Sequence, residues 1–188
     1  MLLKKHQVAS ITFVAFCVLD IIAVFLKIEW LHYIAKPLLM PALIVLFLTT
    51  ENKNKAKLYL IISALIFSWL GDVFLLAQDN KPLFFILGLT SFLTTHILYI
   101  VYFYKIAAGN FSTLKKNRFI VLLVAAYGIG LLWILCPHLA QMKIPVVIYA
   151  TVICTMLLCS INIRASVNNI AFNYFLAGAL FLFYPTHY

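Results

Sequence analysis

The stretch SALIFSWLGDVFLLA, residues 63–77, decides the fold class. It is apolar enough to cross a lipid bilayer, and the one charge within it is the carboxylate of Asp72. A carboxylate at membrane depth is energetically costly, so it persists where it pairs with another group, faces a wet cavity or takes part in chemistry. The rest of the sequence has to account for both the span and the charge inside it.

The composition of the whole chain is typical of a membrane protein. Of the 188 residues, 65% are hydrophobic and 10% are charged, whereas a soluble globular protein has about 25% charged residues. Apolar segments of about 20 residues, the length of a helical membrane span, recur along the chain. The predicted spans are residues 8–26, 31–50, 58–78, 83–104, 119–137 and 145–163, with a shorter one at 170–184. We therefore predict an all-α, polytopic transmembrane helix bundle of six to seven spans, forming a single domain over residues 1–188.

The basic residues between the spans predict the orientation. Ten of them fall on the side of the N-terminus: Lys4, Lys5, Lys53, Lys55, Lys57, Lys105, Lys115, Lys116, Arg118 and Arg164. The opposite side has Lys27, Lys81 and Lys143. The positive-inside rule then places the N-terminus in the cytoplasm, and we expect an integral protein of a bacterial inner (cytoplasmic) membrane. This asymmetry explains the net charge of +9, so no nucleic-acid partner is needed, and no nucleic-acid-binding motif is present.

On this topology several polar residues fall at one depth. With a rise of about 1.5 Å per residue, Asp20, Lys36 and Asp72 lie within a few ångströms of one level in the outer third of the membrane. Tyr149 falls at a similar level, and His96 lies roughly 10 Å deeper than Asp72 by the same rise. Polar groups from several spans therefore converge toward one layer.

The span at 83–104 has an ordered face. Gly88, Phe92, His96 and Tyr99 follow one another at helical spacing, which places them on one side of the helix. Gly88 permits close approach of another helix, while His96 and Tyr99 supply proton-handling and hydrogen-bonding groups. The same pattern also fits a packing face in which the histidine bonds a neighbouring carbonyl.

The span at 31–50 contains two prolines four residues apart, Pro37 and Pro41. Each removes a helix hydrogen bond, so we expect a kink. In lipid the freed carbonyl groups must find partners or line a cavity. Lys36 precedes the kink, where it is able to bind a phosphate, neutralise Asp72 or Asp20, or extend to the outer interface.

Together these residues resemble the YhhN family. The resemblance is carried by Lys36-Pro37 with Pro41, Gly71-Asp72, the face Gly88/Phe92/His96/Tyr99, and Pro145 with Tyr149. It runs from about residue 30 to about residue 183 and implies a polytopic protein of about eight spans. Characterised members are lysoplasmalogenases, which hydrolyse the vinyl-ether bond of a lysoplasmalogen to a fatty aldehyde and glycerophospho-ethanolamine or -choline. The resemblance implies a lysophospholipid substrate within the bilayer and no nucleotide, flavin or metal.

The implied chemistry suits the polar residues. A vinyl ether is cleaved after its β-carbon is protonated, which needs a carboxylic acid that is neutral near neutral pH, and a low dielectric favours that form. We expect Asp72 to be this acid and His96 to relay a proton. Lys36 is expected to hold the lipid phosphate, and Tyr99 and Tyr149 to bind the substrate.

The end of the sequence departs from the family pattern. Residues 177–183 match the family's Gly-Ala and Leu/Phe run, but Tyr184 and Pro185 stand where the family usually has Ser-Asp. We therefore expect a C-terminally truncated member that lacks the second family aspartate and the last span. By depth, Asp20 is a possible second carboxylate, which would stabilise the cation and orient water as in glycosidases.

Two other functions remain open. A small lipid or solute transporter would use the proline-interrupted span and Asp72 to line a pathway. The layer of polar residues is shifted toward one side of the membrane. This fits a site that opens to that side better than it fits a transporter with alternating access. In a non-catalytic membrane protein, Lys36 and Asp72 would form a structural pair.

Overall fold

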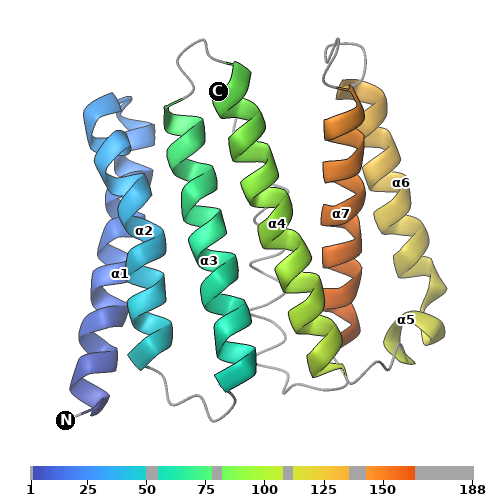
Figure 1. Ribbon diagram of the computed structural model, residues 1–188, viewed down its shortest axis with the longest axis horizontal. Coiled ribbons are helices and arrows are strands. Elements are labelled where there is room, and N and C mark those ends of the chain that lie inside the picture. The colour runs from blue at the N-terminus through green and yellow to red at the C-terminus, as the bar shows by residue number, and fades with distance from the viewer. Residues whose placement is uncertain (1, 50–54, 78–81, 108–111, 136–142, 164–188) are drawn as a thin grey trace. The chain divides into compact units, whose positions relative to one another are not determined.

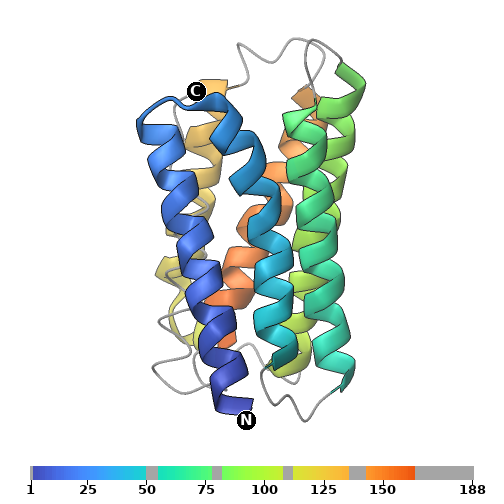
Figure 2. The same ribbon diagram turned by 90° about the vertical axis from the view of Figure 1, so that its left-hand side faces the viewer.

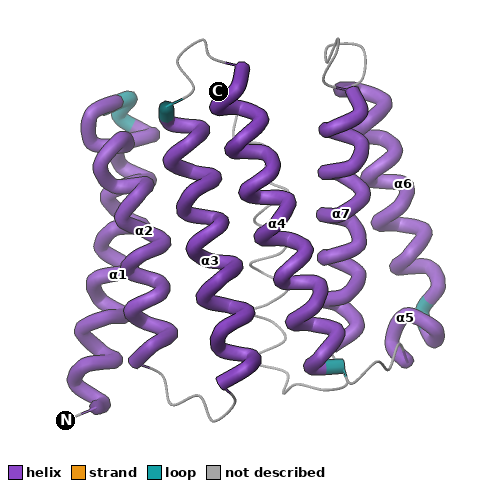
Figure 3. The backbone as a smooth tube through the Cα atoms, in the orientation of Figure 1, coloured by secondary structure: helices purple, strands orange, loops and turns teal. Residues whose placement is uncertain are grey.

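The computed structural model describes residues 2–49, 55–77, 82–107, 112–135 and 143–163, and these are helical apart from short connections (Figure 3). The helices are α1 (Leu2–Phe25), α2 (Glu29–Thr49), α3 (Lys55–Leu76), α4 (Pro82–Ile106), α5 (Ser112–Lys116), α6 (Arg118–Leu135) and α7 (Lys143–Asn162) (Figure 1). The predicted all-α fold is confirmed. The short helix α5, between α4 and α6, is the one element of the described chain that the sequence pattern did not predict.

Six of the helices are long and apolar enough to cross a membrane. They are the segments Gln7–Phe25, Glu29–Thr49, Lys55–Leu76, Pro82–Ile106, Arg118–Leu135 and Lys143–Asn162. The predicted bounds of the first six spans differ from these by at most three residues. The expected span at 170–184 lies outside the described residues.

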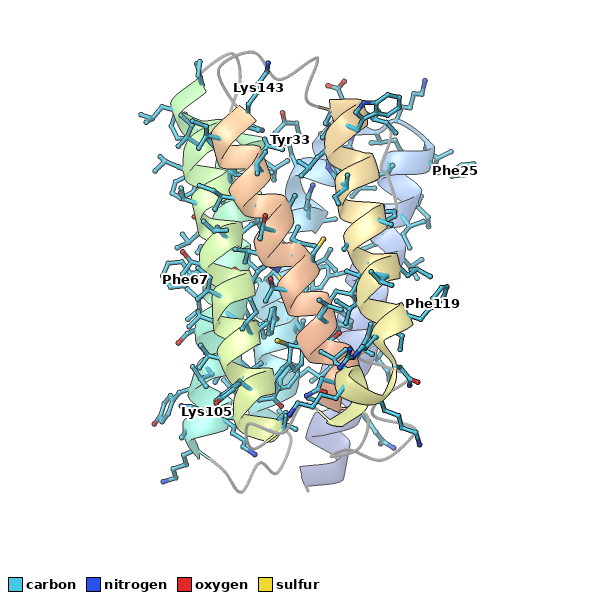
Figure 4. The ribbon with its side chains drawn as sticks, turned by 90° about the vertical axis from the view of Figure 1, so that its right-hand side faces the viewer. Phe25, Tyr33, Phe67, Lys105, Phe119 and Lys143 are labelled. Atoms are coloured by element: carbon cyan, nitrogen blue, oxygen red, sulfur yellow. The ribbon has the colours of Figure 1, made fainter. Side chains whose placement is uncertain are left out.

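Large apolar side chains cover the outer surfaces of these helices. Phe25, Trp133 and Phe119 are 87%, 80% and 74% exposed, and Figure 4 shows Phe25, Phe67 and Phe119 projecting away from their helices. Moving such a side chain from water into hydrocarbon is favourable by about 1.5–3 kcal/mol. Helices that are apolar on every side and still exposed are typical of a membrane span, so the chain is an integral membrane protein.

The chain divides into two compact units, residues 1–98 and residues 99–188. The first contains α1, α2, α3 and most of α4, and its consecutive helices run in opposite directions (Figures 1 and 2). The second contains the end of α4 with α5, α6 and α7. Lys105 and Lys143 lie at opposite ends of its helices (Figure 4), as the predicted alternation of loops requires. The single-domain organisation and the cytoplasmic N-terminus stay predictions.

A tight turn joins α1 to α2. The amide of Ile28 donates to the carbonyl oxygen of Ala23 at 2.9 Å, and the amide of Lys27 donates to that of Val24 at 3.2 Å. This pair of bonds is a Schellman motif, whose left-handed position is usually glycine. Here it is Lys27, with φ 54°. The turn leaves three residues between the helices, so their adjoining ends pack closely side by side.

Two glycines let α3 and α4 approach closely in the first unit. A Cβ added to Gly71 would lie 2.8 Å from the ring of Phe92, and one added to Gly88 would lie 2.8 Å from Cδ2 of Leu75. The hydroxyl of Thr95 reaches across the interface to the carbonyl oxygen of Ala64 at 3.1 Å. The predicted close approach at Gly88 is therefore confirmed.

The second unit packs around α7. Its buried apolar side chains form two clusters, one made of Phe103, Ala107, Met156 and Ile163 and the other of Val124 and Leu157. Gly128 of α6 faces Cys154 of α7, whose Sγ would lie 2.8 Å from an added Cβ. The amide of Leu114 donates to Oδ1 of Asn162 at 3.4 Å, which attaches α5 to the end of α7.

Candidate functional site

Four ionisable side chains gather in the first unit, and we call them the α1–α3 polar cluster: Asp20 of α1, His32 and Lys36 of α2, and Asp72 of α3. Nδ1 of His32 lies 2.9 Å from Oδ1 of Asp20. Lys36, Asp20 and His32 are all close enough to act electrostatically on the carboxyl group of Asp72. All four are partly buried. The structure therefore brings together Asp20, Lys36 and Asp72, which the sequence had placed at one depth.

The α1–α2 turn positions the first pair. Asp20 is seven residues before Lys27, the middle residue of the connection, and His32 is five residues after it. In a tight antiparallel hairpin, residues at similar distances from the turn lie at similar heights. Lys36 is four residues after His32, so both side chains emerge on one face of α2. This arrangement places two nitrogen bases and one carboxylate together.

A hydrogen bond between α2 and α3 fixes the position of Asp72 along α2. Because Pro41 has no amide hydrogen, the carbonyl of Pro37 loses its helix donor. Nε1–H of Trp69 donates to this carbonyl oxygen at 2.9 Å, and α2 continues as a helix through both prolines. The freed carbonyl has thus found a partner, one of the two outcomes expected in lipid. Trp69 lies three residues before Asp72, so the bond holds that carboxyl near Lys36.

The charges of the cluster oppose and balance one another. Protonated Lys36 or His32 attracts an ionised Asp72, whereas an ionised Asp20 repels it. The cluster therefore has groups suited to donate a proton, accept one and bind an anion.

His96 lies deeper in the first unit. It is 4% exposed, and its neighbour Thr95 bonds the carbonyl of Ala64. Ala64 precedes Asp72 by eight residues, about 12 Å along the helix at the α-helical rise. This agrees with the roughly 10 Å expected from the topology, again at that rise per residue. The structure does not bring His96 to the level of the cluster.

Tyr99 and Tyr149 belong to the second unit. The ring of Tyr99 stacks on Phe103, with centroids 6.2 Å apart and planes inclined by 20°. Tyr149 is partly buried on α7. Neither is part of the α1–α3 polar cluster, and their assignment to substrate binding stays a prediction.

Reasoning from the sequence missed His32. The signal was present twice, since His32 is one helical turn before Lys36 and lies across the turn from Asp20 at a similar distance. Within the described ranges, no group of three or more His, Cys, Asp or Glu side chains is arranged to hold a metal ion.

The comparison with protein families now adds to this geometry. The model of the YhhN family matches residues 31–184. This chain belongs to the YhhN family. No match was found among curated proteins or among solved structures. The match to the YhhN family includes His32, Lys36 and Asp72 and begins after Asp20, so α1 contributes its carboxylate from outside the matched segment.

Proposed function

We propose that this YhhN family member hydrolyses the vinyl-ether bond of a lysoplasmalogen, releasing a fatty aldehyde and a glycerophospho-ethanolamine or -choline. The observation that carries the proposal is Asp72, a carboxyl group inside an apolar helix with a lysine and a second carboxylate in electrostatic reach. Family membership supports it, as do the six helices of the described residues that are long and apolar enough to cross a membrane, because the substrate is itself a membrane lipid.

Asp72 is the proton donor in this proposal. Its carboxylic acid protonates the β-carbon of the vinyl ether, and the electron pair of the double bond forms the new C–H bond. The product is an oxocarbenium ion facing the Asp72 carboxylate. Water adds to this cation and loses one proton, and the hemiacetal collapses as its C–O bond to glycerol breaks and the leaving glycerol oxygen takes up that proton. The Asp72 carboxylate recovers a proton from the hemiacetal hydroxyl, so the acid is regenerated.

Lys36 is the proposed phosphate-binding group. A lysine amine is a compact cation that binds phosphate as a point charge. Lys36 lies on α2 within two turns of its start at Glu29, close to the end of the helix, where a lipid headgroup lies. The hydrocarbon chain would then extend along the apolar helices while the vinyl ether, next to the glycerol, reaches Asp72. The inner membrane of a bacterium is the proposed location.

Asp20 is the proposed second carboxylate. In the proposed mechanism Asp72 carries the proton, and Asp20, which acts on it electrostatically, is ionised. The ionised group stabilises the oxocarbenium ion. His96, two turns deeper, is the proposed proton relay between the cluster and the interior of the helix bundle.

Mass spectrometry of aldehyde release by the purified protein in lipid nanodiscs tests this function. The wild-type protein should release aldehyde from lysoplasmalogen and leave a 1-acyl lysophospholipid of the same headgroup and chain length intact. Asp72→Asn should lose the activity, because an amide donates no proton to carbon. As the control, Thr90→Val removes an exposed hydroxyl that bonds its own helix and should be fully active. Full activity of Asp72→Asn, or no aldehyde from the wild type, contradicts the proposal.

A further inference from the structure

The contact between His32 and Asp20 has the geometry of a base held by a carboxylate. Nδ1 and Oδ1 are 2.9 Å apart, and the two side chains are 16% and 19% exposed. When Asp20 is ionised, its carboxylate only accepts hydrogen bonds, and Nδ1–H of His32 then donates to it. This fixes the neutral tautomer in which Nε2 carries the lone pair. Asp20 also stabilises the imidazolium that forms if Nε2 takes a proton.

This pair lies within electrostatic reach of the carboxyl group of Asp72. His32 and Asp20 both act electrostatically on Asp72, and His32 is one turn from Lys36 on the same face of α2. An imidazole in this position has a proton donor on α3 and a cation on α2 as neighbours. Its side chain is 16% exposed, and a base of this kind has to reach water.

Vinyl-ether hydrolysis requires a base as well as an acid. After Asp72 has given up its proton, a water molecule must attack the oxocarbenium ion and lose a proton of its own. Asp20 has one carboxylate oxygen committed to His32. The group next to it that is built to accept a proton is the imidazole.

We propose, on the basis of the function proposed above, that His32 is the general base that deprotonates the attacking water and that Asp20 is its positioning residue. The water oxygen forms the new bond to carbon, and its proton moves to Nε2 of His32. When the hemiacetal collapses, the glycerol oxygen leaves with the bonding electron pair and takes this proton from the imidazolium. The hemiacetal hydroxyl proton goes to Asp72, so one water is consumed and both residues return to their starting states.

The assignment predicts a signature that a purely structural pair would not produce. Without the base, water addition slows while protonation by Asp72 continues. The oxocarbenium ion then loses a proton from its β-carbon back to Asp72 and re-forms the vinyl ether. In D2O this return exchanges the vinyl hydrogen for deuterium in the substrate that has not been hydrolysed.

Hydrolysis of lysoplasmalogen in D2O by the purified protein in nanodiscs tests the proposal, with mass spectrometry of both the aldehyde and the recovered substrate. For His32→Gln we expect aldehyde release to fall about 10²-fold or more, the usual contribution of general-base catalysis, and the recovered substrate to gain deuterium. Asp20→Asn keeps a hydrogen bond but permits the wrong tautomer, and should show the same exchange with a smaller loss. Asp72→Asn should show neither hydrolysis nor exchange.

Tyr33→Phe is the matched control, because Tyr33 is adjacent to His32 on α2 and 49% exposed. It should hydrolyse at the wild-type rate without exchange. Unchanged hydrolysis in His32→Gln overturns the proposal, and so does a loss of hydrolysis without exchange in both His32→Gln and Asp20→Asn. Neither result affects the vinyl-ether hydrolase function, which the wild-type arm tests separately: if that arm releases no aldehyde, the function itself is contradicted.

Discussion

The α1–α3 polar cluster and the α6–α7 interface are built from equally apolar helices, yet they treat polar groups in opposite ways. In the cluster, Asp20 bonds His32 on another helix, and next to the cluster Trp69 of α3 donates to the Pro37 carbonyl of α2. Between α6 and α7, the hydroxyls of Thr151 and Thr155 bond carbonyls of their own helix at 2.8 Å.

The cavity of about 250 Å³ at the α6–α7 interface is correspondingly apolar. Its lining residues are Val121, Val124, Ala125, Gly128, Ile129, Leu132, Ala150, Thr151, Cys154, Thr155 and Leu158. A polar group that is satisfied locally leaves the interface to apolar packing. A polar group satisfied across helices fixes both helices and gathers charge at one place, which is what a reactive site requires.

The largest expected difference between the two regions is in KM, which a substitution of Lys36 should raise and a substitution at the α6–α7 interface should not. Lys36→Met should raise KM for lysoplasmalogen about 10- to 100-fold with kcat little changed, because a hydrogen bond to a charged group contributes about 1.5–3 kcal/mol. Steady-state kinetics of aldehyde release measure both constants. Lys36→Arg keeps the charge and should restore most of the affinity, and Thr151→Val at the α6–α7 interface should match the wild type. An unchanged KM in Lys36→Met would identify Lys36 as a structural partner of Asp72.

Alanine substitutions at two glycines test the packing described for α4 and for α6. In Gly88→Ala the new Cβ meets Leu75 at 2.8 Å and the Gly71 carbonyl oxygen at 3.3 Å, so α3 and α4 must separate, at a cost of about 1–3 kcal/mol. Gly130 on α6 has no atom within 4 Å of an added Cβ. Gly130→Ala should therefore stabilise the protein by about 0.5–1 kcal/mol. Unfolding in detergent micelles measures both, and equal effects would contradict the described packing.

The bond from Trp69 to Pro37 is open to a rescue experiment. Trp69→Phe leaves the Pro37 carbonyl without its donor and should destabilise the protein by about 1–2 kcal/mol. Adding Pro41→Ala restores an amide hydrogen to that carbonyl within α2. The double variant should therefore be more stable than Trp69→Phe alone. If the two substitutions lower the free energy of unfolding additively in the same assay, the Trp69 indole does not donate a hydrogen bond to this carbonyl.

A small effect is expected at the α1–α2 turn. Lys27 occupies a left-handed conformation that is unfavourable for a residue with a Cβ by about 1–2 kcal/mol. Lys27→Gly should raise the free energy of unfolding by about 1 kcal/mol, and Lys27→Ala should not. A gain in both variants would mean that the lysine charge, and not the backbone, was responsible.

Much of the fold was predictable because one physical length governs it. A helix needs about 20 apolar residues to cross the hydrocarbon core, so the six described spans could be read from the sequence with small errors at their ends. Depth was predictable for the same reason, and it placed Asp20, Lys36 and Asp72 at one level. His32 was missed because its significance depends on a partner, Asp20, that faces it only when the α1–α2 turn is tight.

The sequence by itself determined the membrane setting, the helical fold, the YhhN family and the position of Asp72 along its helix. The tertiary structure alone decided which groups meet near that position, pairing His32 with Asp20 and Trp69 with the Pro37 carbonyl. The physical reason is that the helical rise fixes position along one axis, whereas rotation about each helix and the choice of neighbour depend on side-chain packing. That packing, through the close contacts of Gly71 and Gly88 and the tight turn at Lys27, is a property of the folded chain.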